Sequence, residues 1–303
     1  MEYPKFKVCA RCFTFNQSKY IIDTMNGFIM QKTDFPFVCC IVDDASTDGE
    51  QEVIMSYVKE NFNLSEGSDY YQKETDYAHI TYAQHKTNAN CYFAVLLLKE
   101  NHYSKHKPKQ PYLAEWMDCV PYIALCEGDD YWIDSLKLQK QIEYLRQNPK
   151  VNIVTHNAYI IYSDGTQNPF NTHVKTGVYN LRQCLYKPWF TPTASFLYRN
   201  NYELSPLWAK NGSNGDMACL YSNLMKGDLF YSNEIMSVYD YGTPNSMSAN
   251  TQKSILYKKK RAMLKTINQL TQNRTILLTF PFQCKLYIKQ FIVEFLDSIR
   301  IRK

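Results

Sequence analysis

The sequence predicts an α/β protein in which a mostly parallel sheet is flanked by helices and followed by a basic, helical C-terminal extension. Three observations support this fold class. Short, continuously apolar segments alternate with amphipathic helical patterns, as is typical of parallel strands buried on both faces. Acidic residues follow two of these apolar segments directly. From residue 252 onward, the chain is far more basic than before.

The first half of the chain predicts four strands and the helices that connect them. An apolar stripe from Ile21 to Ile29 indicates the first helix, because residues at this spacing share one helix face. Thr47 and Glu50 form a capping-box pattern at the start of the second helix. The segment 101–117 is polar and carries several lysines, so we expect a surface excursion. Strands are expected at 7–13, 37–42, 79–82 and 120–126, and helices over 91–99 and from Asp134 to Pro149.

The second half has a looser pattern of short strand-like segments separated by turns. A helix is expected to begin at Gly215–Asp216 and to end at Gly227. From residue 252 the pattern is helical, and an apolar stripe from Ile288 to Ile299 is surrounded by lysine and arginine. The expected strands lie at 151–155, 158–162, 194–199, 229–231 and 235–239.

Length and composition indicate an ordered globular protein. The 303 residues, 45% of them hydrophobic, suffice for one large domain or two modest ones. We expect the ten cysteines to be reduced, since several lie in apolar segments and Met1 to Lys5 show no signal-peptide pattern. Cys9 and Cys12 form only half of a zinc-binding pattern. No continuous apolar run is long enough for a membrane span, so a cytoplasmic protein is expected.

Charge is distributed unevenly along the chain. Residues 252–303 carry a net charge of +10, whereas the first 251 residues sum to −5. The cluster Lys258–Arg261 beside an apolar stripe suits peripheral contact with the anionic inner face of a membrane. A helical appendage that packs on the body and exposes its basic face to solvent is an equally good interpretation. The acidic body argues against nucleic acid as a partner.

Two acidic clusters lie at the ends of predicted parallel strands. Asp43, Asp44 and Asp48 follow the second strand, and Glu127–Asp130 follows the strand at 120–126. Because ligands bind beyond the carboxyl ends of such strands, we expect both clusters to line one crevice. Closely spaced carboxylates repel one another, and oxygen-only ligands favour Mg²⁺ or Mn²⁺. The sequence therefore predicts a site for a metal ion and a nucleoside diphosphate.

The sequence contains four distinctive elements. They are Phe15-Asn16, Val42–Gly49 (VDDASTDG), Glu127–Trp132 (EGDDYW) and Asn214–Met217 (NGDM). Together they resemble the inverting, family-2 glycosyltransferases, especially bacterial enzymes of surface-polysaccharide assembly. These enzymes have the GT-A fold, a Rossmann-like sheet that binds nucleotide sugars. The resemblance covers roughly residues 5–248 and implies a metal-dependent transfer of sugar to an acceptor hydroxyl with inversion.

The resemblance also implies a role for individual residues. Asp216 would be the catalytic base that deprotonates the acceptor hydroxyl. A metal ion, Mg²⁺ or Mn²⁺, would neutralise the leaving diphosphate. The metal ligands would be Glu127, Asp129 and Asp130. The nucleotide-binding residues would be Phe13, Phe15, Asn16, Asp43, Asp44, Asp48 and Asp129.

The second half of the chain is expected to contact the acceptor, which would be a saccharide or a lipid-linked molecule. A UDP-sugar is the donor favoured by the resemblance. Residues 1–250 would form the glycosyltransferase domain, with a nucleotide-sugar half at 1–132 and an acceptor half at 133–250, before the basic region 251–303. Sugar or acceptor contacts are expected from Trp132, Trp189, Thr193 and Trp208, with core packing as the alternative.

The sequence departs from the family pattern at two positions. Glu127 stands where the metal motif has aspartate, and Gly242 stands where a histidine is usual near the diphosphate. Two other interpretations therefore stay open, a sugar-phosphate nucleotidyltransferase and a catalytically inactive nucleotide-sugar binder. The first would need a glycine-rich first loop, and Phe13–Asn16 contains no glycine.

Overall fold

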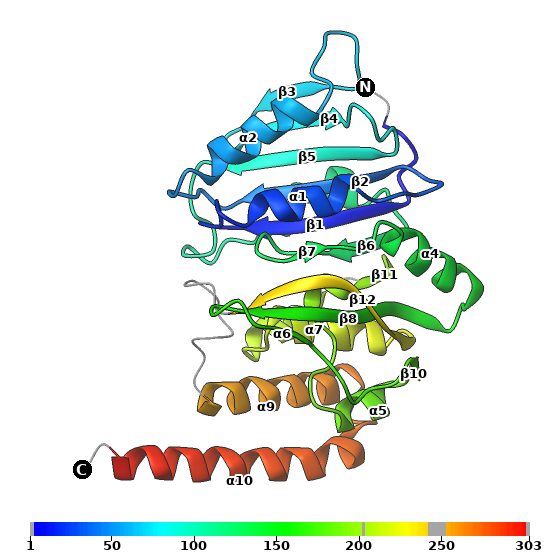
Figure 1. Ribbon diagram of the computed structural model, residues 1–303. Coiled ribbons are helices and arrows are strands. Elements are labelled where there is room, and N and C mark those ends of the chain that lie inside the picture. Colours follow the sequence, from blue (N-terminus) through cyan, green and yellow to red (C-terminus); the bar gives the residue numbers. More distant parts are fainter. Residues whose placement is uncertain (1–2, 202–203, 242–252, 301–303) are drawn as a thin grey trace.

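The computed structural model describes residues 3–201, 204–241 and 253–300. A single 12-stranded sheet forms the centre of the molecule (Figure 1). The strands are β1 (Val8–Thr14), β2 (Phe37–Asp43), β3 (Tyr71–Glu74), β4 (Ala78–Gln84), β5 (Cys91–Leu98), β6 (Tyr122–Leu125), β7 (Tyr131–Trp132), β8 (Val151–Tyr162), β9 (Gln167–Pro169), β10 (Gly177–Tyr179), β11 (Leu197–Arg199) and β12 (Asp228–Tyr241). Their order is β10-β12-β8-β11-β6-β1-β2-β5-β4-β3, with β7 paired to β12 and β9 to β8.

The centre of the sheet is parallel, and the outer parts are mixed. The neighbours β6, β1, β2 and β5 all run in the same direction. Every residue of β2 and β5 is buried, which explains their continuously apolar sequences. Antiparallel pairs join β4 to β5 and β11 to β6, whereas β8 and β12 form a second parallel pair. The predicted α/β class, with a parallel centre flanked by helices, is confirmed.

Helices cover both faces of the sheet. They are α1 (Ile21–Ile29), α2 (Glu50–Asn61), α3 (Ala114–Met117), α4 (Lys137–Gln147), α5 (Leu181–Tyr186), α6 (Leu207–Lys210), α7 (Gly215–Leu224), α9 (Lys253–Leu270) and α10 (Ile276–Arg300), with 3₁₀ turns η1 (Gln110–Leu113) and η2 (Thr193–Ser195). One apolar core lies under α1, α2 and α4 and includes Phe28, Ile54 and Ile142. The other lies under α3, α5, α6, α7 and α9.

Three predictions for the first half of the chain differ from the structure. Residues 91–98 form β5 rather than a helix, because a short, fully apolar segment suits a buried strand as well as a buried helix. The segment 101–117 is only partly a surface excursion, since Leu113, Trp116 and Met117 are buried. The capping box is also absent. Gly49, at a φ of 89°, occupies the N-cap of α2 without a side-chain cap.

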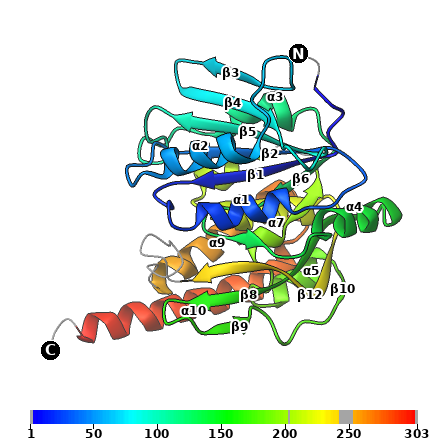
Figure 2. The same cartoon turned by 45° about the horizontal axis from the view of Figure 1, so that its top comes forward.

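The two C-terminal helices relate differently to the body. Met263, Leu264 and Ile267 place α9 within the core shared with α7. Helix α10 packs mainly on α9 and is the outermost element, at the opposite end of the molecule from β3 (Figures 1 and 2). Gly242 and the predicted boundary near residue 250 lie outside the described residues, so the domain division stays a prediction.

Candidate active site

Parallel strands bring the predicted acidic clusters to one edge of the sheet. Thr14 and Asp43 are register partners at the carboxyl ends of β1 and β2. Glu127 follows closely on β6, the other parallel neighbour of β1. The backbone N–H of Gly128 donates to the Phe13 carbonyl at 3.2 Å, which fixes the acidic turn beside β1. The expected convergence at this edge is therefore present.

Hydrogen bonds join the loop after β1 to the loop after β2. The Asn16 N–H donates to Ser46 Oγ at 2.9 Å, and the Thr47 N–H donates to Asn16 Oδ1 at 2.8 Å. The Ser18 N–H donates to Asp48 Oδ2 at 3.0 Å. Asn16 takes a positive φ of 54°, a conformation that asparagine tolerates better than most residues. Asn16 and Asp48 thus shape the rim of the site.

Glu50 is hydrogen-bonded to both of these loops. Its buried carboxylate accepts hydrogen bonds from the Thr14 hydroxyl, the Gln17 N–H at 2.8 Å and Ser46 Oγ at 2.9 Å. Asp43 is also fully buried, and its Oδ1 accepts from the Ser46 N–H at 3.1 Å. Burial raises the pKa of both carboxyls. Sequence reasoning assigned Glu50 to a helix cap and missed this structural role.

Asp44 is bound by the loop that follows β5. Its Oδ1 accepts from the His102 N–H at 2.7 Å, and its Oδ2 accepts from the Tyr103 N–H at 3.0 Å. Lys109 completes the arrangement with an ion pair to Oδ2 at 2.8 Å. Because the Asp44 side chain has no exposed surface, it acts on this loop, and its direct contact with a nucleobase stays a prediction.

Gly128 allows the acidic turn to lie close to β1. A Cβ atom at this position would lie 2.2 Å from Thr14 Oγ1 and 2.5 Å from Gln17 Oε1. The hydroxyl of buried Thr24 donates to the carbonyls of Gly128 and Asp130, at 3.0 and 2.7 Å. The turn is therefore held from both sides. This packing requires glycine at the second position of the motif.

The carboxylates of the turn repel one another. Desolvation, together with Asp216 and Asp129, raises the pKa of Glu127 to about 7, although Arg11 opposes the shift. Burial and the neighbouring carboxylates also raise the pKa of Asp130, whose Oδ1 accepts the Asp240 N–H at 3.3 Å. Desolvation and the charge of Asp240 raise the pKa of Asp129. This crowding indicates a site with too little positive charge.

Asp216 belongs to the same group of charges. It lies in the first turn of α7, where its side chain stays accessible to solvent while the surrounding protein raises the pKa of its carboxyl. A side-chain hydrogen bond with Thr193 and the charges of Arg11 and Lys259 oppose that shift. The structure thus places Asp216 beside Thr193 and close enough to Glu127 and Asp130 for their charges to interact. Its role as the catalytic base stays a prediction.

The aromatic candidates divide into two groups. Trp132 and Trp208 are only 1% exposed, so the prediction that they face a sugar is wrong. Trp132 packs on Phe28 and donates Nε1–H to the Ala194 carbonyl at 2.9 Å, and Trp208 fills the core under α9. Trp189 is partly accessible and stays a candidate.

Phe13 and Phe15 lie on either side of Thr14, at the carboxyl end of β1. Phe13 is half-buried, with Arg11 4.7 Å and Lys109 5.1 Å from its ring centroid, and Phe15 is exposed. Arg11 Nη2 also lies 3.8 Å from Glu127 Oε1. Sequence reasoning missed both cations. Arg11 had a signal, as the one charged residue in an otherwise apolar strand, whereas nothing in the sequence set Lys109 apart from nearby lysines.

A divalent ion suits the chemistry of these side chains. Carboxylate oxygens of Glu127 and Asp129 are hard donors, and their raised pKa values show a need for positive charge. In the described residues, however, no three carboxylate, imidazole or thiol groups gather into a metal-binding cluster. Asp130 is 3% exposed. The metal site therefore stays a prediction.

The architecture matches solved glycosyltransferase structures. S. aureus TarS 1–349 in complex with UDP-GlcNAc superposes with a TM-score of 0.56 at 15% identity, covering 87% of this chain and 67% of TarS. The same protein in complex with UDP gives a TM-score of 0.52 at 15% identity, with 87% and 66% covered. This chain therefore has a glycosyltransferase fold.

Sequence comparison finds mycobacterial relatives. The chain is 30% identical over 154 residues to the uncharacterized proteins Rv1520 of Mycobacterium tuberculosis and Mb1547 of Mycobacterium bovis. The match covers 51% of this chain and 36% of each relative, so the chain spans little more than a third of their length. No family model matches the chain.

Proposed function

We propose that the protein transfers a sugar from a nucleoside diphosphate sugar to an acceptor hydroxyl with inversion, as family-2 GT-A enzymes do. One observation carries the proposal. In a glycosyltransferase fold, Arg11 lies 3.8 Å from Glu127 at the carboxyl ends of the parallel strands, where the charges of Asp129 and Asp216 also act on Glu127. This is the edge of an open α/β sheet at which ligands bind. A UDP-sugar is the favoured donor, which agrees with the UDP and UDP-GlcNAc complexes of TarS.

The nucleotide would bind along the loops after β1 and β2. Phe13 and Phe15 offer aromatic surface, and Asn16 and Asp48 fix the shape of the rim. Asp43 and Asp44 act beneath the nucleotide by holding their loops in place. Arg11 and Lys109 bring positive charge to the phosphate side. They would do so in a sequence that has Gly242 where the family usually has a histidine.

Glu127, Asp129 and Asp130 would hold Mg²⁺ or Mn²⁺. Such an ion neutralises a departing diphosphate when it is bound. Asp129 and Glu127 are the better placed ligands, because the Asp130 carboxylate is buried and accepts the Asp240 N–H. Asp130 would then support the turn.

Asp216 would take the proton from the acceptor hydroxyl. Its raised pKa increases its basicity, and Thr193 orients its carboxylate through a hydrogen bond. Attack from the face opposite the diphosphate would invert the anomeric carbon. Trp189 remains the aromatic candidate for contact with the acceptor, in the proposed acceptor half at 133–250.

The biological setting that fits these features is cell-surface polysaccharide assembly in a bacterium. The acceptor would be a saccharide or a lipid-linked molecule. We place the protein in the cytoplasm, at the inner face of the membrane, because of the basic region 251–303.

A donor screen tests the proposal. Isothermal titration with UDP-, GDP- and dTDP-sugars in the presence of Mn²⁺, followed by an assay for released nucleotide, should give binding and slow turnover with one donor. Binding without turnover against a panel of acceptors would favour an inactive binder. Nucleotide formation that depends on pyrophosphate would favour a nucleotidyltransferase.

The variant Asp216→Asn tests the base. Loss of a general base reduces turnover by about 10²- to 10⁴-fold, while donor affinity should stay within a factor of about two. Asp118→Asn, at an exposed site beyond α3, is the matched control. Unchanged turnover in Asp216→Asn would remove Asp216 from the mechanism.

A further inference from the structure

Helix α10 presents an exposed apolar face along its described length. Leu277 is 89% exposed, and Phe280 and Ile288 are each 61% exposed. Phe291 and Ile292 continue the same face, and Tyr287 lies at its border beside α9. All six positions fall within one side of the helical projection. Contiguous apolar surface of this kind marks an interaction site.

The opposite face of α10 is fixed to α9. Thr279 donates to Oδ1 of the buried Asn268 side chain at 2.8 Å, and Gln290 Oε1 accepts from Arg261 at 2.7 Å. The Arg261 guanidinium also lies 3.2 Å from the Tyr287 ring centroid. Because these polar contacts hold one side of the helix against α9, the exposed apolar face lies on its other side. Figure 1 shows α10 as the outermost helix, next to α9.

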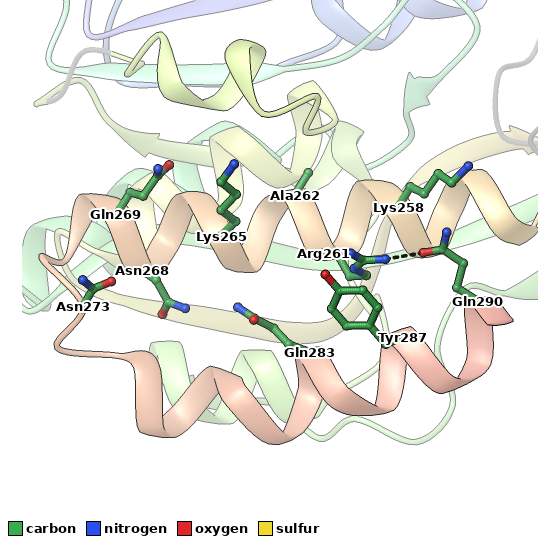
Figure 3. A pocket seen from close by; sticks show the side chains of 10 residues that line it. All are labelled: Lys258, Arg261, Ala262, Lys265, Asn268, Gln269, Asn273, Gln283, Tyr287 and Gln290. Atoms are coloured by element: carbon green, nitrogen blue, oxygen red, sulfur yellow. Dashed lines mark hydrogen bonds between the residues drawn. The ribbon is translucent and has the colours of Figure 1, made fainter.

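Basic residues flank this apolar face on both sides. Lys258, Arg261 and Lys265 line the groove between α9 and α10, a cavity of about 550 Å³ (Figure 3). Lys285 and Lys289 are exposed at the other border of the face. The sequence from 253 to 293 contains no aspartate or glutamate. The surface therefore combines apolar area with positive charge alone.

We propose that α10 lies in the plane of an anionic lipid bilayer, with Leu277, Phe280 and Ile288 inserted among the acyl chains and the flanking lysines at the headgroup phosphates. An apolar face bordered by lysine and arginine is the pattern of interfacial helices. The proposal goes beyond sugar transfer and does not rest on it, because it concerns a surface away from the nucleotide site.

The contacts and charges of α10 argue against two alternatives, a membrane-spanning helix and an interface with a second copy of the chain. Among the described residues, Ile276–Val293 is the one helical segment long and apolar enough to cross a membrane. The sequence did not predict it, because polar residues such as Thr279 and Lys285 interrupt its apolar runs. Crossing would break the contacts with α9 and place Lys285 and Lys289 in hydrocarbon, which is costly. A second copy of the chain would bring two basic surfaces together, so charge complementarity favours an anionic bilayer.

Membrane docking would also position the candidate active site. Helix α9 packs on α7, and Lys259 of α9 is close enough to influence Asp216. A bilayer against α10 would thus lie on the side of the molecule that carries the proposed base. Helix α10 follows α9 in the chain and packs on it.

Vesicle flotation of the whole protein, without any nucleotide sugar, tests the proposal. The native protein should float with phosphatidylcholine vesicles that contain a third of phosphatidylglycerol, and much less with phosphatidylcholine alone. The double variant Phe280→Ser/Ile288→Ser should lower the partition coefficient by at least about tenfold, because two inserted side chains are lost. Lys285→Gln/Lys289→Gln should weaken binding and its dependence on salt.

Ile22→Ser is the matched control, since Ile22 is an exposed apolar residue on α1, and its variant should float like the native protein. Circular dichroism checks that each variant is folded. Equal flotation of native protein and Phe280→Ser/Ile288→Ser, or no flotation of the native protein with anionic vesicles, would overturn the proposal. A native dimer that becomes monomeric in this variant would instead assign the face to a second copy. Donor binding is measured separately, so either proposal can fail alone.

Discussion

Lys137 is a charged residue placed entirely inside the protein. Its ammonium donates to Gln141 Oε1 at 2.8 Å and lies 4.0 Å from the Trp132 ring centroid. Burial lowers its pKa from 10.5 to about 7. Folding therefore releases a proton from Lys137 between these two pH values, and this residue's contribution to stability rises with pH across that window.

The variant Lys137→Met should remove this dependence. Between pH 7 and 9, the free energy of unfolding of the native protein should rise by about 2 kcal/mol relative to the variant. Chemical denaturation at several pH values measures this difference in the free energy of unfolding. Lys140→Met is the control, because ion pairs with Asp134 and Glu234 raise the pKa of Lys140 and keep it charged throughout. A constant difference between native protein and Lys137→Met would contradict the prediction.

Gly128→Ala tests the packing of the acidic turn. The added methyl group would overlap Thr14 Oγ1, so the turn must move away from β1. We expect a loss of about 1–3 kcal/mol in stability and weaker donor binding. Thermal unfolding and titration calorimetry provide the measurements. Gly177→Ala, where the nearest atom lies at 4.0 Å, should be nearly neutral, and equal effects of both changes would contradict the model of the turn.

At the scale of elements, Asp44 links β2 to the loop after β5. Asp44→Asn removes the charge that pairs with Lys109. Because the asparagine NH₂ group cannot accept a hydrogen bond, it also removes the acceptor for one of the backbone N–H groups of His102 and Tyr103. A loss of about 1–3 kcal/mol is expected, with faster hydrogen exchange at residues 101–104. Lys105→Met, which breaks an exposed ion pair with Glu100 in the same region, serves as the control. Unaltered exchange in Asp44→Asn would show that the loop is held otherwise.

The sequence predicted most of the central elements, because their patterns are strong. The apolar segments of β1, β2 and β6 and the amphipathic stripe of α1 are clear, and acids at strand ends located the site. β5 was misassigned because period analysis does not separate a short buried strand from a buried helix. The sequence also predicted a sugar contact for Trp132 and a surface position for Lys109, whereas Trp132 is buried and Lys109 pairs with Asp44. Both outcomes depend on contacts between residues distant in sequence.

At the scale of the whole molecule, the two C-terminal helices should differ in importance for folding. Removal of residues 273–303 takes away α10, whose described apolar side chains, such as Leu278 and Phe282, are at most partly buried. The remaining protein should keep donor binding and lose flotation with vesicles. Removal of 253–303 also deletes Met263 and Ile267 from the core and should give insoluble or unfolded protein. Loss of folding after the shorter deletion would show that α10 is part of the core.

The packing of α10 on α9, and of α9 on α7, has a kinetic consequence. A protein held at a bilayer by its outermost helix meets lipid-borne acceptors by lateral diffusion in two dimensions. Its rate would then follow the mole fraction of acceptor in the membrane, and diluting that acceptor with inert lipid would slow the reaction at constant bulk concentration. The soluble donor would still arrive from three dimensions. The rate would therefore depend on the surface concentration of the acceptor and on the bulk concentration of the donor.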